Sequence, residues 1–273
     1  MSHPKKRLQA AGLWAKKAWG QNFLHDQGTQ AKIAEATVRG LEGQPVLEIG
    51  AGLGDLTAAL LTRRDRVLAV ERDRDLVPLL RERFADAAGF EVVETNALTY
   101  TISEEEGPWT VVGNLPYHIS SRILFHLLAQ RSVWSRAVLM FQKEVAQRVA
   151  ATAPESPHWS GLSARVARLC TVQWVGEVSP SCFYPPPKVD SAVVALSPRP
   201  EADGLADEDF SEMVRVVFAE RRKTLRNNLK KGIPRPIEEI DAALGGLGID
   251  PRIRGERLSV EQLSDLTKAL ILN

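Results

Sequence analysis

The sequence predicts an α/β fold with an open, mostly parallel sheet, followed by a small α-helical domain. First, short runs rich in Val, Ile and Leu alternate with helical stretches from residue 44 to about residue 142, as in parallel strands that are buried on both faces. Second, two more apolar runs surround the proline-rich loop 179–188. Third, only helical patterns follow Pro200. We therefore expect one domain over residues 1–200 and a helical domain over residues 201–273.

The strands and helices of the first domain follow from local patterns. Two further strands, 172–178 and 189–196, should pair at one end of the sheet, with one of them reversed. The strands expected to be parallel are 45–50, 66–71, 90–95, 109–114 and 136–141. Helices are expected at 28–41, 54–63, 73–86 and 120–130, the last with Ile123, Leu124, Leu127 and Leu128 on one face.

The second domain has helical spacing throughout. Leu225 and Leu229 are one turn apart, and Ser259 with Gln262 fits a capping box at the start of a last helix. An acidic linker, 201–209, precedes these helices.

The composition is that of a globular protein. Of the 273 residues, 44% are hydrophobic and 25% are charged, which excludes a disordered chain, a collagen-like repeat and a coiled-coil rod. No run of eighteen apolar residues occurs, and the basic N-terminus lacks the apolar core of a secretory signal, so no membrane association is expected. Cys170 and Cys182 are too few for a disulfide framework, and we expect a cytoplasmic protein.

The net charge of +1 hides segregated blocks of charge. Residues 1–22 carry five bases and no acid, and residues 214–235 carry eight bases and one acid. Residues 201–212 carry six acids and no base. Such segregation produces a basic face for nucleic acid on a nearly neutral protein, although solvated helix faces give the same pattern.

A glycine-rich segment, Glu48-Ile-Gly50-Ala-Gly52-Leu-Gly54, follows the first strand and precedes a helix. Glycines allow a sharp turn and close approach to a ligand. Glu71 ends the second strand, where a carboxylate accepts hydrogen bonds from ribose hydroxyls. The glycine spacing differs from the pyrophosphate fingerprint, and Asp55 stands where that fingerprint needs Gly or Ala. S-adenosylmethionine, a nucleoside with a positive sulfonium and no phosphate, therefore fits better than a dinucleotide, which disfavours hydride transfer.

Asn114-Leu-Pro-Tyr117 follows the fourth strand. Methyl transfer to an exocyclic amine needs acceptors that hold its two N–H groups, because the nitrogen lone pair is otherwise conjugated into the base. The Asn114 side-chain oxygen and the Pro116 carbonyl are candidates, on a turn that proline stiffens. Tyr117 offers a ring face for the base. Asn96, which follows the third strand, is a candidate acceptor for an adenine amino group.

Phe183 lies in a loop with three prolines and is a candidate for the second ring face against a flipped base. No metal is expected, because none of the histidines and cysteines has metal-ligand spacing.

Together these motifs resemble the ribosomal RNA adenine N6,N6-dimethyltransferases, and most closely the small-subunit (16S) branch, whose loss gives kasugamycin resistance. The resemblance rests on the segments Gly20-Gln-Asn-Phe-Leu24, Glu48–Gly52, Asn114–Tyr117, Phe183–Ser191 and Phe218–Asn228, and it spans nearly the whole chain. It implies a Rossmann-like class I S-adenosylmethionine-dependent methyltransferase fold. It also implies dimethylation of two adjacent adenosines near the 3′ end of small-subunit rRNA during assembly of the 30S particle, by a monomer.

The resemblance further assigns residues. Asn22 and Leu24 would contact the donor, in a pocket completed by Gly50, Gly52, Glu71, Asn96 and Asn114. A helix carrying Arg221, Arg222, Lys223 and Arg226 would grip the rRNA. Asn96 replaces the family's usual Asp, which alters the hydrogen bonding to adenine, and His118 replaces its usual Asn.

Several other activities are compatible with part of this pattern. The large-subunit rRNA methylases of macrolide resistance share the core, but the basic segment 218–228 and Leu115 favour the small-subunit branch. A DNA adenine methylase would need a target-recognition domain that the sequence lacks. A non-catalytic ribosome assembly factor would not need the glycine segment, Glu71 and the Asn114–Tyr117 motif together.

Overall fold

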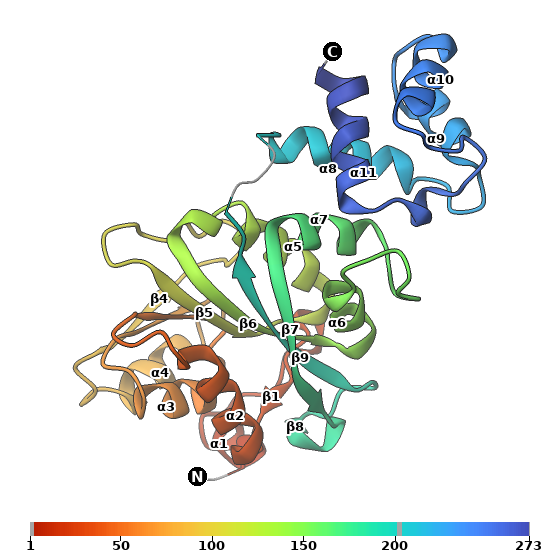
Figure 1. The fold of residues 1–273 in the computed structure, drawn as a ribbon. Helices are drawn as coiled ribbons and strands as arrows, with labels where there is room; N and C mark the ends of the chain where they lie inside the picture. The colour runs from red at the N-terminus through yellow and green to blue at the C-terminus, as the bar shows by residue number, and fades with distance from the viewer. Residues whose placement is uncertain (1–2, 201–203, 273) are drawn as a thin grey trace. The chain divides into compact units, whose positions relative to one another are not determined.

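A computed structural model describes residues 3–200 and 204–272, and Figure 1 shows its elements. A seven-stranded sheet has the order β4-β3-β2-β5-β6-β9-β7. The parallel strands are β2 (Val46–Ile49), β3 (Val67–Glu71), β4 (Phe90–Glu94), β5 (Trp109–Asn114) and β6 (Trp134–Gln142). Strand β9 (Ser191–Pro198) runs antiparallel to β6 and separates it from β7 (Cys170–Val178). The predicted strands, their parallel part and the reversal near the end are confirmed.

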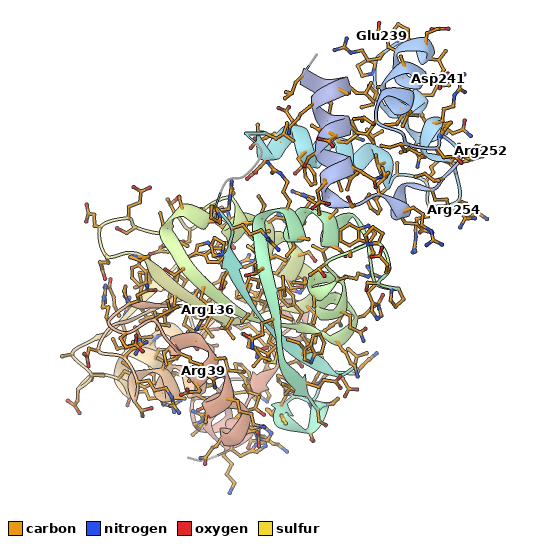
Figure 2. The ribbon with its side chains drawn as sticks, viewed as in Figure 1. Arg39, Arg136, Glu239, Asp241, Arg252 and Arg254 are labelled. Carbon is orange, nitrogen blue, oxygen red and sulfur yellow. The ribbon has the colours of Figure 1, made fainter. Side chains whose placement is uncertain are left out.

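The central strands form because their side chains are apolar on both faces. Every residue of β2 and β3 is buried, and Val46 of β2 and Val67 of β3 pack in one core with Ile33 and Leu60. The predicted helices appear as α2 (Gln27–Val38), α3 (Asp55–Leu61), α4 (Val77–Arg83) and α5 (Ser120–Leu128). Arg136 of β6 donates to the carbonyl of Arg39 at 2.6 Å, which caps the end of α2; Figure 2 labels both residues.

Three helices were not predicted: α1 (Pro4–Ala10), α6 (Lys143–Ala150) and α7 (Gly161–Leu169). Helix α1 is short and begins with a proline, and the ring of His3 accepts from the Lys5 N–H at 3.3 Å. A second, two-stranded sheet pairs β1 (Phe23–Leu24) with β8 (Phe183–Tyr184). It joins two segments that are far apart in the sequence.

The chain divides into two compact units. The first comprises residues 1–146 and 173–198, and the second comprises 147–172 and 199–273. The predicted domain boundary at residue 200 lies near the observed division between residues 198 and 199. Residues 201–203, the first of the predicted helical domain and of the acidic linker, fall outside the described part of the chain. The segment 147–172 differs from the expectation of a catalytic domain spanning 1–200, because it groups with the C-terminal helices.

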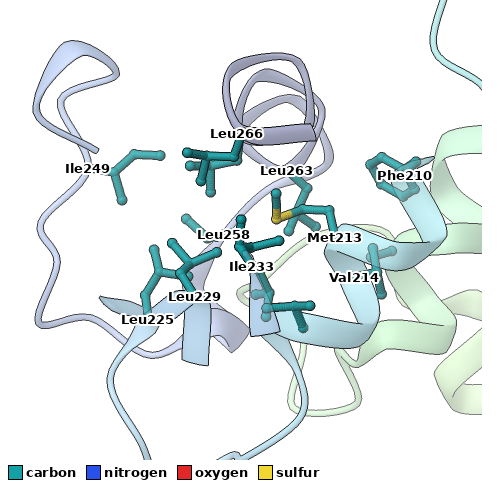
Figure 3. Packing of buried hydrophobic residues seen from close by; sticks show 14 of the residues in the cluster. Phe210, Met213, Val214, Leu225, Leu229, Ile233, Ile249, Leu258, Leu263 and Leu266 are labelled. Atoms are coloured by element: carbon teal, nitrogen blue, oxygen red, sulfur yellow. The ribbon is translucent and has the colours of Figure 1, made fainter. Parts of the chain in front are cut away.

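The second unit has its own core, part of which Figure 3 shows. Trp159 and Ala164, from the segment that precedes β7, belong to the same buried cluster as Phe210 and Met213. A Cβ on Gly161 would meet the Val214 side chain at 3.1 Å, so α7 packs closely on the helix that contains Val214. The C-terminal helices are α8 (Asp207–Val217), α9 (Leu225–Gly232), α10 (Ile237–Gly246) and α11 (Val260–Thr267), the last with the predicted capping box.

Candidate functional site

A cavity of about 300 Å³ opens at the carboxyl ends of the parallel strands in the first unit. Gly50 follows β2, Glu71 ends β3, Asn96 follows β4 and Asn114 ends β5, and all four residues line the cavity. The N-terminal segment 18–24 forms another part of the wall. The structure therefore brings together the predicted donor-binding residues Asn22, Leu24, Gly50, Gly52, Glu71, Asn96 and Asn114, with Pro116 and Tyr117 beside them.

The glycine segment makes the tight turn that the sequence predicts. Gly52 and Gly54 have φ values of 58° and 78°, in the left-handed region that favours glycine. A Cβ on Gly52 would meet the Phe23 ring at 3.1 Å, and one on Gly54 would meet the Phe84 ring at 2.6 Å. The loop is thus closely covered on these sides, whereas a Cβ on Gly50 would meet nothing within 4 Å. That open side leaves room for a ligand.

Asp55 has a structural partner that the sequence did not reveal. Its buried carboxylate pairs with Arg83 of α4 at 2.9 Å and with Arg7 of α1. Arg7 and Arg83 also donate to the carbonyl of Leu53 in the glycine segment. The charge of Asp55 is therefore neutralised, and its carboxylate fastens the glycine turn to two helices.

Glu71 is buried and its carboxylate is held by backbone groups. Oε2 accepts the Gly52 N–H at 2.9 Å, and Oε1 accepts the Asp73 N–H at 2.8 Å. Burial raises the pKa of Glu71, and these backbone N–H donors oppose the rise. Each carboxylate oxygen has a further lone pair, so the group fits the ribose hydroxyls of an adenosyl donor beside the open side of Gly50.

Glu48 lies on the same wall and forms no close ion pair among the described side chains, although the charge of Arg83 lowers its pKa. It is 1% exposed, and its carboxylate accepts the Thr57 hydroxyl at 2.5 Å. Burial, together with the charges of Glu71 and Asp55, raises the pKa of Glu48 to about 7, although the Thr57 hydrogen bond opposes the rise. An ionised Glu48 is therefore costly in this site unless positive charge enters the cavity.

Asn114 is oriented by the N-terminal segment. Its Nδ2 donates to the backbone carbonyl of Asn22 at 2.9 Å. The amide can satisfy this bond in one orientation only, so Oδ1 is left as an acceptor at the cavity. This is the arrangement that holding an N–H of a target amine requires.

The next residues of the motif form a turn of 3₁₀-helix, Tyr117–Ile119. The Pro116 carbonyl accepts the Ile119 N–H at 3.1 Å, so a target amine would share this acceptor. The Tyr117 hydroxyl is hydrogen-bonded to Ser191 at 2.6 Å, and burial raises its pKa. This bond ties the ring to the first residue of β9.

Phe183 and Asn96 are less accessible than their predicted roles require. Phe183 is 3% exposed, belongs to the buried core and does not line the cavity, although its partner in β1, Leu24, does. Its ring therefore has no free face in this conformation, and its stacking role stays a prediction. Asn96 lines the cavity, but its Oδ1 already accepts the Leu98 N–H at 3.1 Å.

The predicted RNA-binding residues lie in the second unit, but only one of them is helical. Arg221, Arg222 and Lys223 occupy the turn before α9, because the helix begins at Leu225 after the cap residue Thr224. The expectation that one helix carries all four residues is wrong. Arg226, which is in α9, is paired through two hydrogen bonds with Asp241, at 2.6 and 2.7 Å, so its charge is already neutralised.

A second basic loop lies beside this turn. The N–H of Leu225 donates to the carbonyl of Ile253 at 2.7 Å, which fixes the loop 251–257 against the start of α9. Arg252 and Arg254 project from that loop, as Figure 2 shows, and their side chains are 86% and 57% exposed. Sequence analysis did not identify these arginines, although the dense basic pattern of residues 252–257 was a usable signal.

Comparisons with known proteins agree with this geometry. Among the described residues, no helix is long and apolar enough to cross a membrane. The family model "Ribosomal RNA adenine dimethylase" matches residues 12–271. A relative from Anaeromyxobacter sp. (strain K), named ribosomal RNA small subunit methyltransferase A, is 43% identical over 98% of this chain and 97% of its own. A relative of the same name from Geobacter sulfurreducens is 42% identical over 97% and 98%.

Two solved structures are also similar. A dimethyladenosine transferase from Plasmodium falciparum has a TM-score of 0.77 at 28% identity, covering 89% of this chain and 95% of its own. The 23S rRNA methyltransferase ErmE has a TM-score of 0.70 at 32% identity, covering 91% and 99%. The fold is thus that of a class I S-adenosylmethionine-dependent methyltransferase, as predicted, and the chain belongs to the ribosomal RNA adenine dimethylase family.

Proposed function

We propose that this chain transfers methyl groups from S-adenosylmethionine to the N6 atoms of two adjacent adenosines near the 3′ end of small-subunit rRNA. The proposal includes a monomer that acts in the cytoplasm on an assembling small-subunit particle. One observation carries the chemistry: Asn114 is held through its Nδ2 by the Asn22 carbonyl at 2.9 Å, so its Oδ1 remains an acceptor beside the glycine turn. The names of relatives at 41–43% identity support the small subunit over the large one.

The residues of the cavity divide the work of methyl transfer. Bound S-adenosylmethionine supplies an electrophilic methyl group on a positive sulfur. Glu71 would hold the ribose, and Gly50 and Gly52 would let the backbone approach the donor. The carboxylate of Glu71 and the glycine turn therefore fit S-adenosylmethionine, a donor that carries no phosphate.

On the acceptor side, Asn114 Oδ1 and the Pro116 carbonyl would accept the two N–H groups of the adenine amine. Held in this way, the amine directs its lone pair at the methyl group, which is a positioning effect. The ring of Tyr117, tied to Ser191, would support the face of the base. The product amine is left with one extra proton, which passes to water, so no dedicated general base is needed.

Methyl incorporation tests the proposal directly. Labelled S-adenosylmethionine is supplied with undermethylated small subunits, large subunits or naked rRNA, and the RNA is digested to nucleosides. Dimethyladenosine from small-subunit particles alone is expected. Label in large-subunit rRNA would contradict the small-subunit assignment, and binding without any label would contradict an enzymatic role and favour an assembly factor.

A further inference from the structure

Residues 13–19 of the N-terminal basic segment have no part in the proposed chemistry, yet the structure anchors this stretch. Lys16 Nζ lies 2.5 Å from Asp73 Oδ1 and 2.6 Å from Asp75 Oδ2. Gln21 Nε2 donates to the other oxygen of Asp73 at 2.6 Å, and its Oε1 accepts the Lys16 N–H at 2.8 Å. Asp73 is 1% exposed. Residues 16–21 are therefore fixed to the loop that follows Glu71.

Two exposed tryptophans lie in or just before this fixed segment. Leu13 and Ala15 pack against the buried cluster that contains Leu8 and Phe23, and the residue between them, Trp14, is 75% exposed. Trp19 is 36% exposed and lines the cavity. An exposed indole on an anchored segment leaves a large apolar surface in contact with water, which indicates that a binding partner covers it.

Two cations lie close to the ring of Trp19. Lys16 Nζ lies 4.8 Å from the centre of the Trp19 ring, and the Arg72 guanidinium carbon lies 5.0 Å from it. Lys17 and Arg72 are exposed. Aromatic rings interleaved with cations are typical of surfaces that bind single-stranded nucleic acid, where bases stack and phosphates pair with the cations.

The segment also adjoins the turn that would hold the target amine. A Cβ on Gly20 would meet the His118 ring at 3.1 Å and the Pro116 side chain at 3.7 Å. Asn22, two residues further on, holds Asn114. Trp19 is therefore the residue directly before Gly20, which packs against the predicted catalytic motif Asn114–Tyr117.

We propose that Trp14 and Trp19, with Lys17 and Arg72, form a stacking platform for the unpaired RNA nucleotides that flank the target adenosine. This inference rests on the proposed function. An adenosine that is drawn into the cavity leaves its neighbours without a stacking partner, and the indole rings replace that partner. Trp14 does not line the cavity, so the platform extends beyond the space that the donor occupies.

Steady-state kinetics on undermethylated small subunits, together with donor binding by calorimetry, test the platform. The double variant Trp14→Ala/Trp19→Ala should raise KM for the subunits by about tenfold or more, because stacking contributes about 1–3 kcal/mol per base. In the single variant Trp14→Ala, whose residue does not line the cavity, the Kd for S-adenosylmethionine should stay within twofold. Trp14→Phe/Trp19→Phe keeps aromatic faces and should recover most of the loss.

The matched control is Trp174→Ala, which removes a tryptophan of similar exposure, 38%, from β7 in the same unit. It should leave KM unchanged. A parallel measurement uses a twelve-nucleotide single-stranded RNA: its binding should weaken in the alanine double variant, and Lys17→Ala/Arg72→Ala should flatten its salt dependence.

The outcomes separate the two proposals. An unchanged KM in the alanine double variant, or an equal loss in the Trp174 variant, overturns the platform. A large rise in the donor Kd with an unchanged KM for the subunits also overturns it, and makes Trp19 a wall of the donor site. Failure of the wild-type protein to methylate any ribosomal particle overturns the proposed function instead, whatever the RNA binding shows.

Discussion

Asn114 combines two tasks in one amide group. Its Nδ2 fixes the N-terminal segment through the Asn22 carbonyl, and its Oδ1 is the acceptor proposed for the target amine. Asn114→Ala should reduce methyl transfer by at least about 100-fold, because an amine that is not held loses its alignment with the methyl group. Calorimetry should still detect S-adenosylmethionine binding, since Glu71 and the glycine turn remain. Turnover near that of the wild type would contradict the positioning role.

The raised pKa of Glu48 should make the free energy of unfolding depend on pH. Its folded-state pKa of about 7 lies above its ordinary value of 4.5, so the folded protein retains a proton that the unfolded chain loses. This carboxyl therefore makes the donor-free protein less stable as the pH rises from 4.5 to about 7, and the full cost remains at higher pH. Glu48→Gln keeps an acceptor for the Thr57 hydroxyl and removes the charge.

Urea denaturation of the donor-free protein at pH 5 and pH 8 measures this effect. The free energy of unfolding of Glu48→Gln relative to the wild type should increase between these pH values by up to about 3 kcal/mol. Glu42→Gln changes an exposed carboxylate and should follow the wild-type pH dependence. Equal pH dependence in all three proteins would show that Glu48 is ionised at no cost.

At the scale of elements, ion pairs connect the glycine turn to helices that are distant in sequence. Arg7 of α1 and Arg83 of α4 share the Asp55 carboxylate and the Leu53 carbonyl. Helix α1 has only seven residues, and such a short helix is not stable without tertiary contacts. The order of α1 therefore depends on this ion-pair group and on the burial of Leu8.

Removal of Arg7 should release α1 from the glycine turn. Arg7→Ala should lower the free energy of unfolding by about 1–3 kcal/mol, since it removes hydrogen bonds to a charged, buried group while Arg83 stays. Limited trypsin digestion should then cleave within residues 3–12 faster than in the wild type. Lys6→Ala, on the exposed side of the same helix, is the control; equal cleavage of both variants would show that Arg7 does not anchor the helix.

At the scale of the whole molecule, the residues proposed for catalysis and those predicted to bind RNA lie in separate compact units. The second unit forms around Phe210, Met213 and the leucines of α9 and α11 (Figure 3). Its tight packing extends to the basic loop, because a Cβ on Gly255 would meet Val217 at 2.4 Å. The arginines of that loop and of the turn before α9 are thus presented by a rigid support.

The double variant Arg221→Ala/Arg222→Ala should weaken binding to undermethylated small subunits and reduce the salt slope by about 2, or about 1 for each lost phosphate contact. Donor binding, in the other unit, should not change. Arg215→Ala removes an exposed arginine of α8, outside the turn before α9, and should have a smaller effect. Unchanged subunit affinity in the double variant would exclude the turn before α9 from the RNA surface.

The sequence by itself determined the features that depend on neighbouring residues. The parallel strands follow from continuous apolar runs, the glycine turn from residues that tolerate positive φ, and the last helix from the capping pair Ser259 and Gln262. The order of the motifs also placed Gly50, Glu71 and Asn114 at one edge of the sheet, because the carboxyl ends of parallel strands meet there.

The tertiary structure alone decided which distant groups became partners. It paired Asp55 with Arg7, Asn114 with the Asn22 carbonyl, and Lys16 with Asp73. It buried Phe183 beside Leu24, and it assigned the segment 147–172 to the C-terminal core. Periodicity and turn chemistry report the conformation of a short segment. The choice of a partner depends instead on how separate segments pack, since only packing sets their distance and their exposure to water.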